Sequence, residues 1–118
     1  MKYLCLVYNE EKKLEAMSRN ELDAFVDEHL AYDEVLQRSG HFIVSEALES
    51  VQAATTVRVR NGRLSVTDGP FAETKEQLGG FFLIQASDLN EAIQVASKIP
   101  SARLGSIEVR PIRELSRP

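Results

Sequence analysis

The chain is poor in the residues that build covalent or metal-held sites. It has one cysteine, Cys5, two histidines and no tryptophan in 118 residues. A lone cysteine forms no internal disulfide, and no zinc-binding spacing surrounds it. No apolar run approaches the ~20 residues that cross a bilayer. The apolar stretch at residues 3–8 is too short for a secretory signal, so we expect a cytoplasmic protein with no membrane partner and a buried, inert Cys5.

Several function classes are disfavoured by what is missing. The formal net charge is −4, whereas nucleic-acid binding needs a concentrated basic surface, so no nucleic-acid partner is expected. The sequence lacks Gly-x-Gly-x-x-Gly, a P-loop, His-Glu-x-x-His and Gly-x-Ser-x-Gly. Two histidines are too few for a His-rich metal site. No metal or organic cofactor is implied.

The pattern that is present predicts one α+β domain over residues 1–118. Residues 2–8 predict a strand, and residues 9–17 a polar connection. Ser18 and Glu21 have the spacing of a capping box at a helix start, and Gly40 is typical of a helix end. The predicted core stripe of this helix consists of Leu22, Phe25, Val26, Leu30 and Leu36.

The middle of the chain predicts a strand at residues 41–48 and then a hairpin. Asn61-Gly62 between alternating runs at 55–60 and 63–67 is the strongest short-range hairpin signal. The expected inner side of the hairpin consists of Val57, Val59, Leu64 and Val66. The expected outer side consists of Arg58, Arg60 and Ser65.

The last third predicts a turn, a strand, a helix and a strand. The turn is at 68–71, the strand follows Gly79-Gly80 at 81–86, and the last strand is at 106–112. Ser87 or Asp88 caps the helix and Pro100 stops it. The expected buried side of this helix consists of Leu89, Ala92, Ile93, Val95, Ala96 and Ile99.

This order predicts a ferredoxin-like β-α-β sandwich with an inserted hairpin. Strands 2–8 and 81–86 are apolar on both faces, but two helices cover only one face of such a sheet. A large exposed apolar face is unusual in a soluble monomer. We therefore expect a homodimer in which a second copy covers the other face.

His29 is the leading candidate for chemistry. It continues the helix stripe, so it faces the sheet, and Asp33 follows on the same helix face within reach of a hydrogen bond or ion pair. A carboxylate that orients an imidazole suits a general base. The alternative is a structural histidine satisfied by its neighbour. His41, at the start of a strand, is interpreted as structural or surface.

Other polar residues admit two interpretations. Asp68 and Phe71 belong to a turn that is either only rigid or forms a pocket mouth. Glu46 is a polar group in a strand that otherwise looks buried, and we count it with Asp68 and Phe71 as a candidate ligand contact. Glu108 and Arg110 share one sheet face, where an ion pair within the dimer is favoured over ligand binding.

The segment Asp68-Gly69-Pro70-Phe71-Ala72-Glu73-Thr74-Lys75-Glu76-Gln77-Leu78-Gly79-Gly80 resembles the DGPF-domain family, a branch of the YCII-related proteins. Residues 1–8, 55–62 and 105–111 extend the resemblance over nearly the whole chain. It implies a dimeric α+β barrel and a His–Asp pair at the active site, with His29 at the expected position. It also implies aromatic chemistry, because at least one YCII-type relative is a dehydrochlorinase of a chlorinated aromatic.

The chain departs from the YCII pattern at two acidic positions. Ile99 stands before Pro100 where an Asp is often found, and Arg38 stands where an acid often ends the first helix. Asp33 could take the acid's place. Some DGPF domains are fused or adjacent to extracytoplasmic-function sigma factors, which implies a regulatory role for the group.

The leading hypothesis is a small-molecule enzyme or binding protein. His29 acts in it as general acid and base, Asp33 orients the imidazole, and Asp68 and Glu46 are polar pocket residues. The rival is a non-enzymatic regulatory module with a sigma-factor link. A third hypothesis is a cofactor-independent oxygenase of the same fold.

Overall fold

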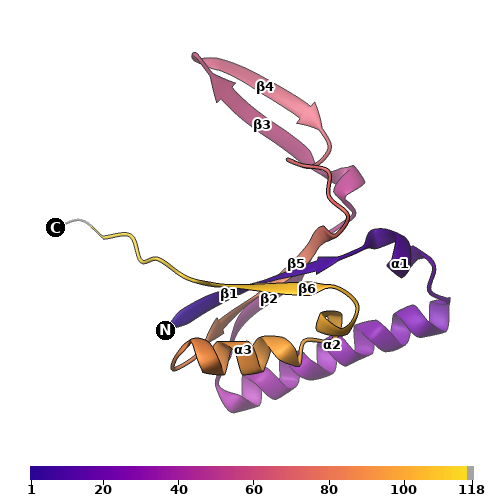
Figure 1. Ribbon diagram of the computed structural model, residues 1–118, viewed down its shortest axis with the longest axis vertical. Helices are drawn as coiled ribbons and strands as arrows, with labels where there is room; N and C mark the ends of the chain where they lie inside the picture. The colour runs from indigo at the N-terminus through magenta and orange to yellow at the C-terminus, as the bar shows by residue number, and fades with distance from the viewer. Residues whose placement is uncertain (117–118) are drawn as a thin grey trace.

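A computed structural model describes residues 1–116 of the chain. Six strands, three α-helices and two short 3-10 helices (η) follow one another in the described part (Figure 1). In chain order they are β1 (Lys2–Asn9), α1 (Glu11–Glu15), α2 (Arg19–Ser39), β2 (Phe42–Ala47), η1 (Val51–Ala53), β3 (Thr55–Arg60), β4 (Arg63–Asp68), β5 (Gln77–Gln85), α3 (Leu89–Ser97), η2 (Pro100–Arg103) and β6 (Ser106–Pro111).

Four strands form an antiparallel sheet in the order β2-β5-β1-β6, and β3-β4 forms a separate hairpin. The strand order and the two long helices give the predicted ferredoxin-like α+β sandwich with an inserted hairpin. Both α2 and α3 lie on the same side of the sheet (Figure 1). Strand β5 begins at Gln77 rather than at the expected Phe81, because Gln77 and Leu78 pair with the end of β1.

Local signals set the ends of helix α2. The Ser18 hydroxyl accepts from the Glu21 backbone N–H, and the Glu21 carboxylate accepts from the Ser18 N–H, so the predicted capping box is formed. Gly40 ends the helix in the left-handed region at φ 82°. The predicted connection at 9–17 is not wholly irregular, since it contains the short helix α1.

The core lies between the sheet and the two helices. Tyr3, Cys5 and Val7 of β1 are buried on that side, and Leu4 and Leu6 point to the opposite, partly exposed side. The core cluster consists of Tyr3, Cys5, Val7, Leu36, Phe82, Ile84, Ala86, Ala92, Val95, Ala96 and Ile99. The sheet therefore has one covered face and one apolar face that the described residues cover only in part.

The two helix stripes are less buried than the periodicity predicted. In α2, Phe25 and Leu36 are buried, but Leu22, Val26 and Leu30 are exposed. These three side chains line a cavity between α2 and the sheet, so they do not pack directly against the sheet. In α3 the expected Leu89 and Ile93 are likewise exposed, whereas the expected Ala92, Val95, Ala96 and Ile99 are buried.

The hairpin forms at the predicted turn, with Asn61 at φ 52° and Gly62 at φ 73°. Val57 pairs with Val66 and Val59 with Leu64, so the four apolar side chains share one face as expected. That face is not an inner side in a single chain, because the four side chains are 59–67% exposed. The hairpin extends away from the side of the sheet that carries the helices (Figure 1), so the core is out of its reach.

Within residues 1–116, no helix has both the length and the apolar character to span a bilayer.

Candidate functional site

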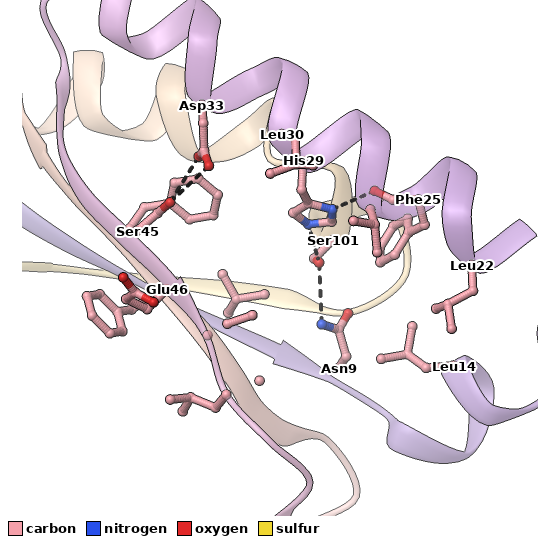
Figure 2. A pocket seen from close by; sticks show the side chains of 18 residues that line it. Asn9, Leu14, Leu22, Phe25, His29, Leu30, Asp33, Ser45, Glu46 and Ser101 are labelled. Carbon is pink, nitrogen blue, oxygen red and sulfur yellow. Dashed lines mark hydrogen bonds between the residues drawn. The ribbon is translucent and has the colours of Figure 1, made fainter.

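A cavity of about 410 Å³ lies between helix α2 and the sheet. Helix α2 supplies one wall, and strands β1, β2 and β5 with helix η2 supply the others (Figure 2). Most of the lining is apolar, and the polar side chains are few. The polar lining residues are Asn9, His29, Asp33, Ser45, Glu46 and Ser101. A few polar groups in an apolar cavity of this size are typical of small-molecule sites.

The imidazole of His29 has a hydrogen-bond partner at each ring nitrogen. Nδ1 lies 2.9 Å from the Phe25 carbonyl oxygen, and Nε2 lies 2.9 Å from Oγ of Ser101. A carbonyl oxygen only accepts, so Nδ1 carries the hydrogen of the neutral ring. Nε2 then holds the lone pair and accepts from the Ser101 hydroxyl.

A third polar residue continues this chain of hydrogen bonds (Figure 2). Nδ2 of Asn9 donates to Oγ of Ser101 at 3.3 Å. Asn9 ends strand β1 and is 7% exposed, and its Oδ1 has no hydrogen-bond partner among the described residues. An unpartnered buried acceptor lowers the stability of the fold by about 1–3 kcal/mol. Packing alone therefore does not explain why an asparagine stands at this position.

Asp33 lies one helical turn from His29 and lines the same cavity, but it does not orient the imidazole. Its two carboxylate oxygens accept from the Ser45 hydroxyl at 3.0 and 3.1 Å. Both nitrogens of His29 are already engaged by Phe25 and Ser101. The expected His29–Asp33 hydrogen bond is therefore corrected: the Phe25 carbonyl sets the imidazole orientation.

The other predicted site residues do not converge on His29. Glu46 touches the cavity, but it lies opposite Phe81 in the sheet register, and Figure 2 shows its side chain pointing away from His29. Asp68 is the last residue of β4, in the exposed hairpin. Phe71 is 81% exposed and lies beneath the guanidinium of Arg58 at 5.9 Å. Asp68 and Phe71 therefore lie outside the cavity that holds His29, because the hairpin projects from the sheet.

Two further pairs of polar side chains form within the chain. Within the single chain, Glu108 and Arg110 form an ion pair with each other, at 2.9 Å between Nε of Arg110 and the carboxylate. Nε2 of His41 lies 3.1 Å from the Glu91 carboxylate. No group of three or more His, Cys, Asp or Glu side chains within residues 1–116 is placed to hold a metal ion.

Sequence reasoning missed Ser101 and Asn9. Asn9 carried a signal, because it continues the inward-facing positions Tyr3, Cys5 and Val7 as a polar residue. Ser101 carried none, since it follows a proline expected only to end a helix. Its contact with His29 spans 72 positions and arises from the packing of η2 against α2.

Comparisons with known proteins agree with this architecture. A family model described as the YCII-related domain matches residues 1–116. An uncharacterised protein of Rhizobium meliloti (strain 1021), R00369, is 39% identical over 114 residues, which cover 95% of this chain and 92% of that protein.

A solved structure shares the fold. It is 5-chloro-2-hydroxyhydroquinone dehydrochlorinase (TftG) from Burkholderia phenoliruptrix AC1100, in complex with 2,5-dihydroxybenzoquinone. Its TM-score is 0.55 at 18% identity, over 96% of this chain and 94% of that one. The family match and the close relative together show that the chain belongs to the YCII-related domain family.

Proposed function

We propose that this chain binds a neutral aromatic molecule bearing hydroxyl groups and that His29 exchanges a proton with one of them. The observation that carries the proposal is the imidazole of His29 at the wall of a mainly apolar cavity, with its hydrogen on Nδ1 held by the Phe25 carbonyl and its basic Nε2 bonded only to the Ser101 hydroxyl. Imidazole gains and loses a proton near neutral pH and so suits a general acid and base.

The apolar walls favour a ring-shaped ligand. Leu22, Val26 and Leu30 of α2 are 39–57% exposed and line the cavity opposite Phe82 of the sheet. These aliphatic side chains are exposed to water in the cavity, and an apolar ring that displaces this water buries their surface. That burial makes binding of the ring more favourable. The fold similarity to an enzyme described with dihydroxybenzoquinone bound supports the same ligand class.

The charges of the lining favour a neutral ligand that donates hydrogen bonds. Asp33 contributes a carboxylate, and no lysine or arginine is among the described lining residues. A carboxylate or phosphate on the ligand would meet like charge without a cationic partner. Asp33 still has acceptor capacity after its bonds to Ser45, because a carboxylate offers about four lone-pair sites.

The proposed step moves one proton. When the ligand binds, the Ser101 hydroxyl gives up its hydrogen bond to Nε2 of His29 and a ring hydroxyl of the ligand takes its place. That ring hydroxyl gives its proton to Nε2, which leaves a phenolate and an imidazolium. The imidazolium then returns that proton to an oxygen or carbon of the ring system as the reaction proceeds. Nδ1 keeps its hydrogen throughout, because the Phe25 carbonyl holds it.

We also propose that the working form is a homodimer. Leu4 and Leu6 of β1 and Leu83 of β5 leave an apolar face only partly covered. The hairpin adds four exposed apolar side chains on one of its own faces. A second copy related by a two-fold axis is the simplest partner for both surfaces.

Binding is tested by titrating hydroquinone into wild type, His29→Gln and His41→Gln. Protein NMR is the readout. We expect hydroquinone to shift the His29 ring signals and the amides of the cavity lining. His41→Gln should bind as wild type does, because His41 lies outside the cavity lining. Benzoate, with its carboxylate, should bind more weakly by about tenfold or more.

Proton transfer is tested with 4-nitrophenol, whose phenolate absorbs visible light. Wild type and His41→Gln should raise the phenolate fraction of the bound probe, and His29→Gln should not. The proposal fails if neither hydroquinone nor 4-nitrophenol binds the cavity, or if His29→Gln ionises the bound probe as well as wild type does.

A further inference from the structure

Ser101 is placed to act on His29 and not on a ligand. Its hydroxyl lies 2.9 Å from Nε2 of His29, the arrangement of a serine nucleophile beside its base. Ser101 is only 1% exposed, however, and its oxygen already accepts from Asn9. A nucleophile must reach the atom it attacks, so this burial favours a role exerted through the imidazole.

The hydrogen bonds have a fixed direction while His29 is neutral. Asn9 donates to Ser101, Ser101 donates to Nε2 of His29, and Nδ1 of His29 donates to the Phe25 carbonyl. Each polar atom in this series of hydrogen bonds has a partner, except at the Asn9 end. There Oδ1 of Asn9 has no partner among the described residues, although Asn9 is 93% buried (7% exposed).

Protonation of His29 reverses the chain. Both ring nitrogens then donate, so the Ser101 oxygen accepts from Nε2–H and the hydroxyl hydrogen needs another acceptor. A half-turn of the Asn9 amide puts Oδ1 where Nδ2 lies now, 3.3 Å from Oγ of Ser101. Asparagine offers a donor and an acceptor of the same shape, so the change needs no movement of the backbone.

We propose that Ser101 and Asn9 form a reversible hydrogen-bond relay that stabilises His29 in both its neutral and its protonated form. They are positioning residues, and the unpartnered Oδ1 of Asn9 is the acceptor held for the protonated form. This role deepens the proposed function, on which its use in proton exchange rests.

The other charged groups around His29 stay the same in the test variants. Asp33, on the next turn of α2, lines the same cavity and is held by Ser45. Glu28 of α2 and Arg103 of η2 form an ion pair at 2.7 Å beside the contact between these two elements. Strand β1 presents only the neutral Asn9 to this cluster, and β2 presents Glu46 on its far side.

The relay is tested on the ligand-free, full-length protein with 15N-labelled histidine. NMR shifts of the ring nitrogens identify the tautomer of neutral His29, and a pH titration gives its midpoint. We expect the hydrogen on Nδ1 in wild type. Asn9→Leu keeps the side-chain size but removes the acceptor, and it should lower the midpoint by about half a unit or more, a threefold change in proton affinity.

Asn9→Asp keeps an acceptor and adds negative charge, so it should raise the midpoint, and it decides the matter if Asn9→Leu does not fold. The relay is rejected if wild-type His29 carries its hydrogen on Nε2. It is also rejected if either folded Asn9 variant titrates within about 0.2 units of wild type. None of these measurements uses a ligand, so a failure of hydroquinone binding rejects the proposed function and leaves the relay standing.

Discussion

The hydroxyl of Ser101 and Nε2 of His29 lie 2.9 Å apart although 72 positions separate them in the chain. Helix η2 brings them together, since it begins with Pro100 and packs against both β1 and α2. Pro100 and Ser101 are both buried, so the hydroxyl is held by packing on each side. A catalytic imidazole gains from such support, because a group held in one orientation loses little entropy when it reacts.

The glycine pair at the start of β5 gives a first prediction, because the two glycines face different surroundings. A Cβ on Gly80 would lie 2.7 Å from the Glu46 carbonyl oxygen of β2, whereas a Cβ on Gly79 meets only ordinary contacts from 3.6 Å. We expect Gly80→Ala to lower the free energy of unfolding by about 2–4 kcal/mol, since backbone must move. Gly79→Ala is the matched control and should cost less than about 1 kcal/mol. Equal denaturant midpoints for the two variants would contradict this.

The elements that the sequence predicted well are those with local signals. The capping box of Ser18 and Glu21 and the Asn61-Gly62 turn each depend on residues within a few positions of one another. Burial was predicted less well. Leu22, Val26 and Leu30 have the period of a core stripe, but they line a cavity, and periodicity shows only which face of a helix is apolar.

The site was predicted only in part, because its contacts are tertiary. His29 was found from its place on the apolar face of α2. Asp33 lies one helical turn from His29, but Nδ1 of His29 donates its hydrogen bond to the Phe25 carbonyl, one turn in the other direction. The Asp33 carboxylate accepts a hydrogen bond from the hydroxyl of Ser45, on β2. Spacing along a helix identifies residues that can meet, and the neighbouring elements decide which of them do.

A second prediction concerns the thiol of Cys5. Burial raises its pKa to about 11 from an ordinary value of 9.0, and the residue is 0% exposed in the core. The thiolate is the reactive form, so a thiol reagent such as DTNB at pH 8 should modify the folded protein only as fast as it unfolds. The same protein in guanidinium chloride should react at once and with one equivalent. Rapid modification of the folded protein would show that Cys5 is accessible.

A third prediction follows from Tyr32. Burial, with a smaller contribution from Cys5, raises the pKa of its phenol to about 12 from 10.0, and its hydroxyl donates to the Val95 carbonyl at 2.6 Å. Above pH 10 the unfolded chain loses this proton before the folded one does, so the free energy of unfolding falls as pH rises through this range.

Tyr32→Phe lacks that titration. We expect wild type to be more stable than Tyr32→Phe by about 1 kcal/mol at pH 8, from the hydrogen bond to Val95. The difference should shrink as the pH rises from 9 to 11 in urea unfolding experiments. A difference that stays constant over this range would contradict the raised pKa.

A fourth prediction tests the hairpin as part of a dimer interface. Leu64 is 67% exposed and pairs with Val59 on the apolar face, whereas Ser65 lies on the other face, opposite Arg58. Leu64→Asp should raise the dissociation constant of the dimer by about tenfold or more, because a two-fold axis buries the new charge twice. Ser65→Asp adds the same charge and should change it little. Light scattering across micromolar concentrations measures this, and a monomeric wild type would rule out the dimer.

A fifth prediction asks whether Asp33 selects the ligand by its charge. Asp33→Asn keeps an oxygen that can accept from Ser45 but removes the negative charge from the cavity lining. Benzoate should then bind about tenfold more tightly, because its carboxylate no longer meets like charge. Hydroquinone should bind about fivefold more weakly, because its hydroxyl loses a charged acceptor.

Glu34→Gln is the control for this experiment, since it removes one charge from the same helix at an exposed position outside the cavity lining. If Glu34→Gln changes benzoate binding as much as Asp33→Asn does, the effect is one of net charge, which acts at long range and is screened by salt. If only Asp33→Asn does so, and the effect persists at high salt, the carboxylate acts inside the cavity. The preference for neutral, hydroxyl-bearing rings then comes from one residue one helical turn from His29.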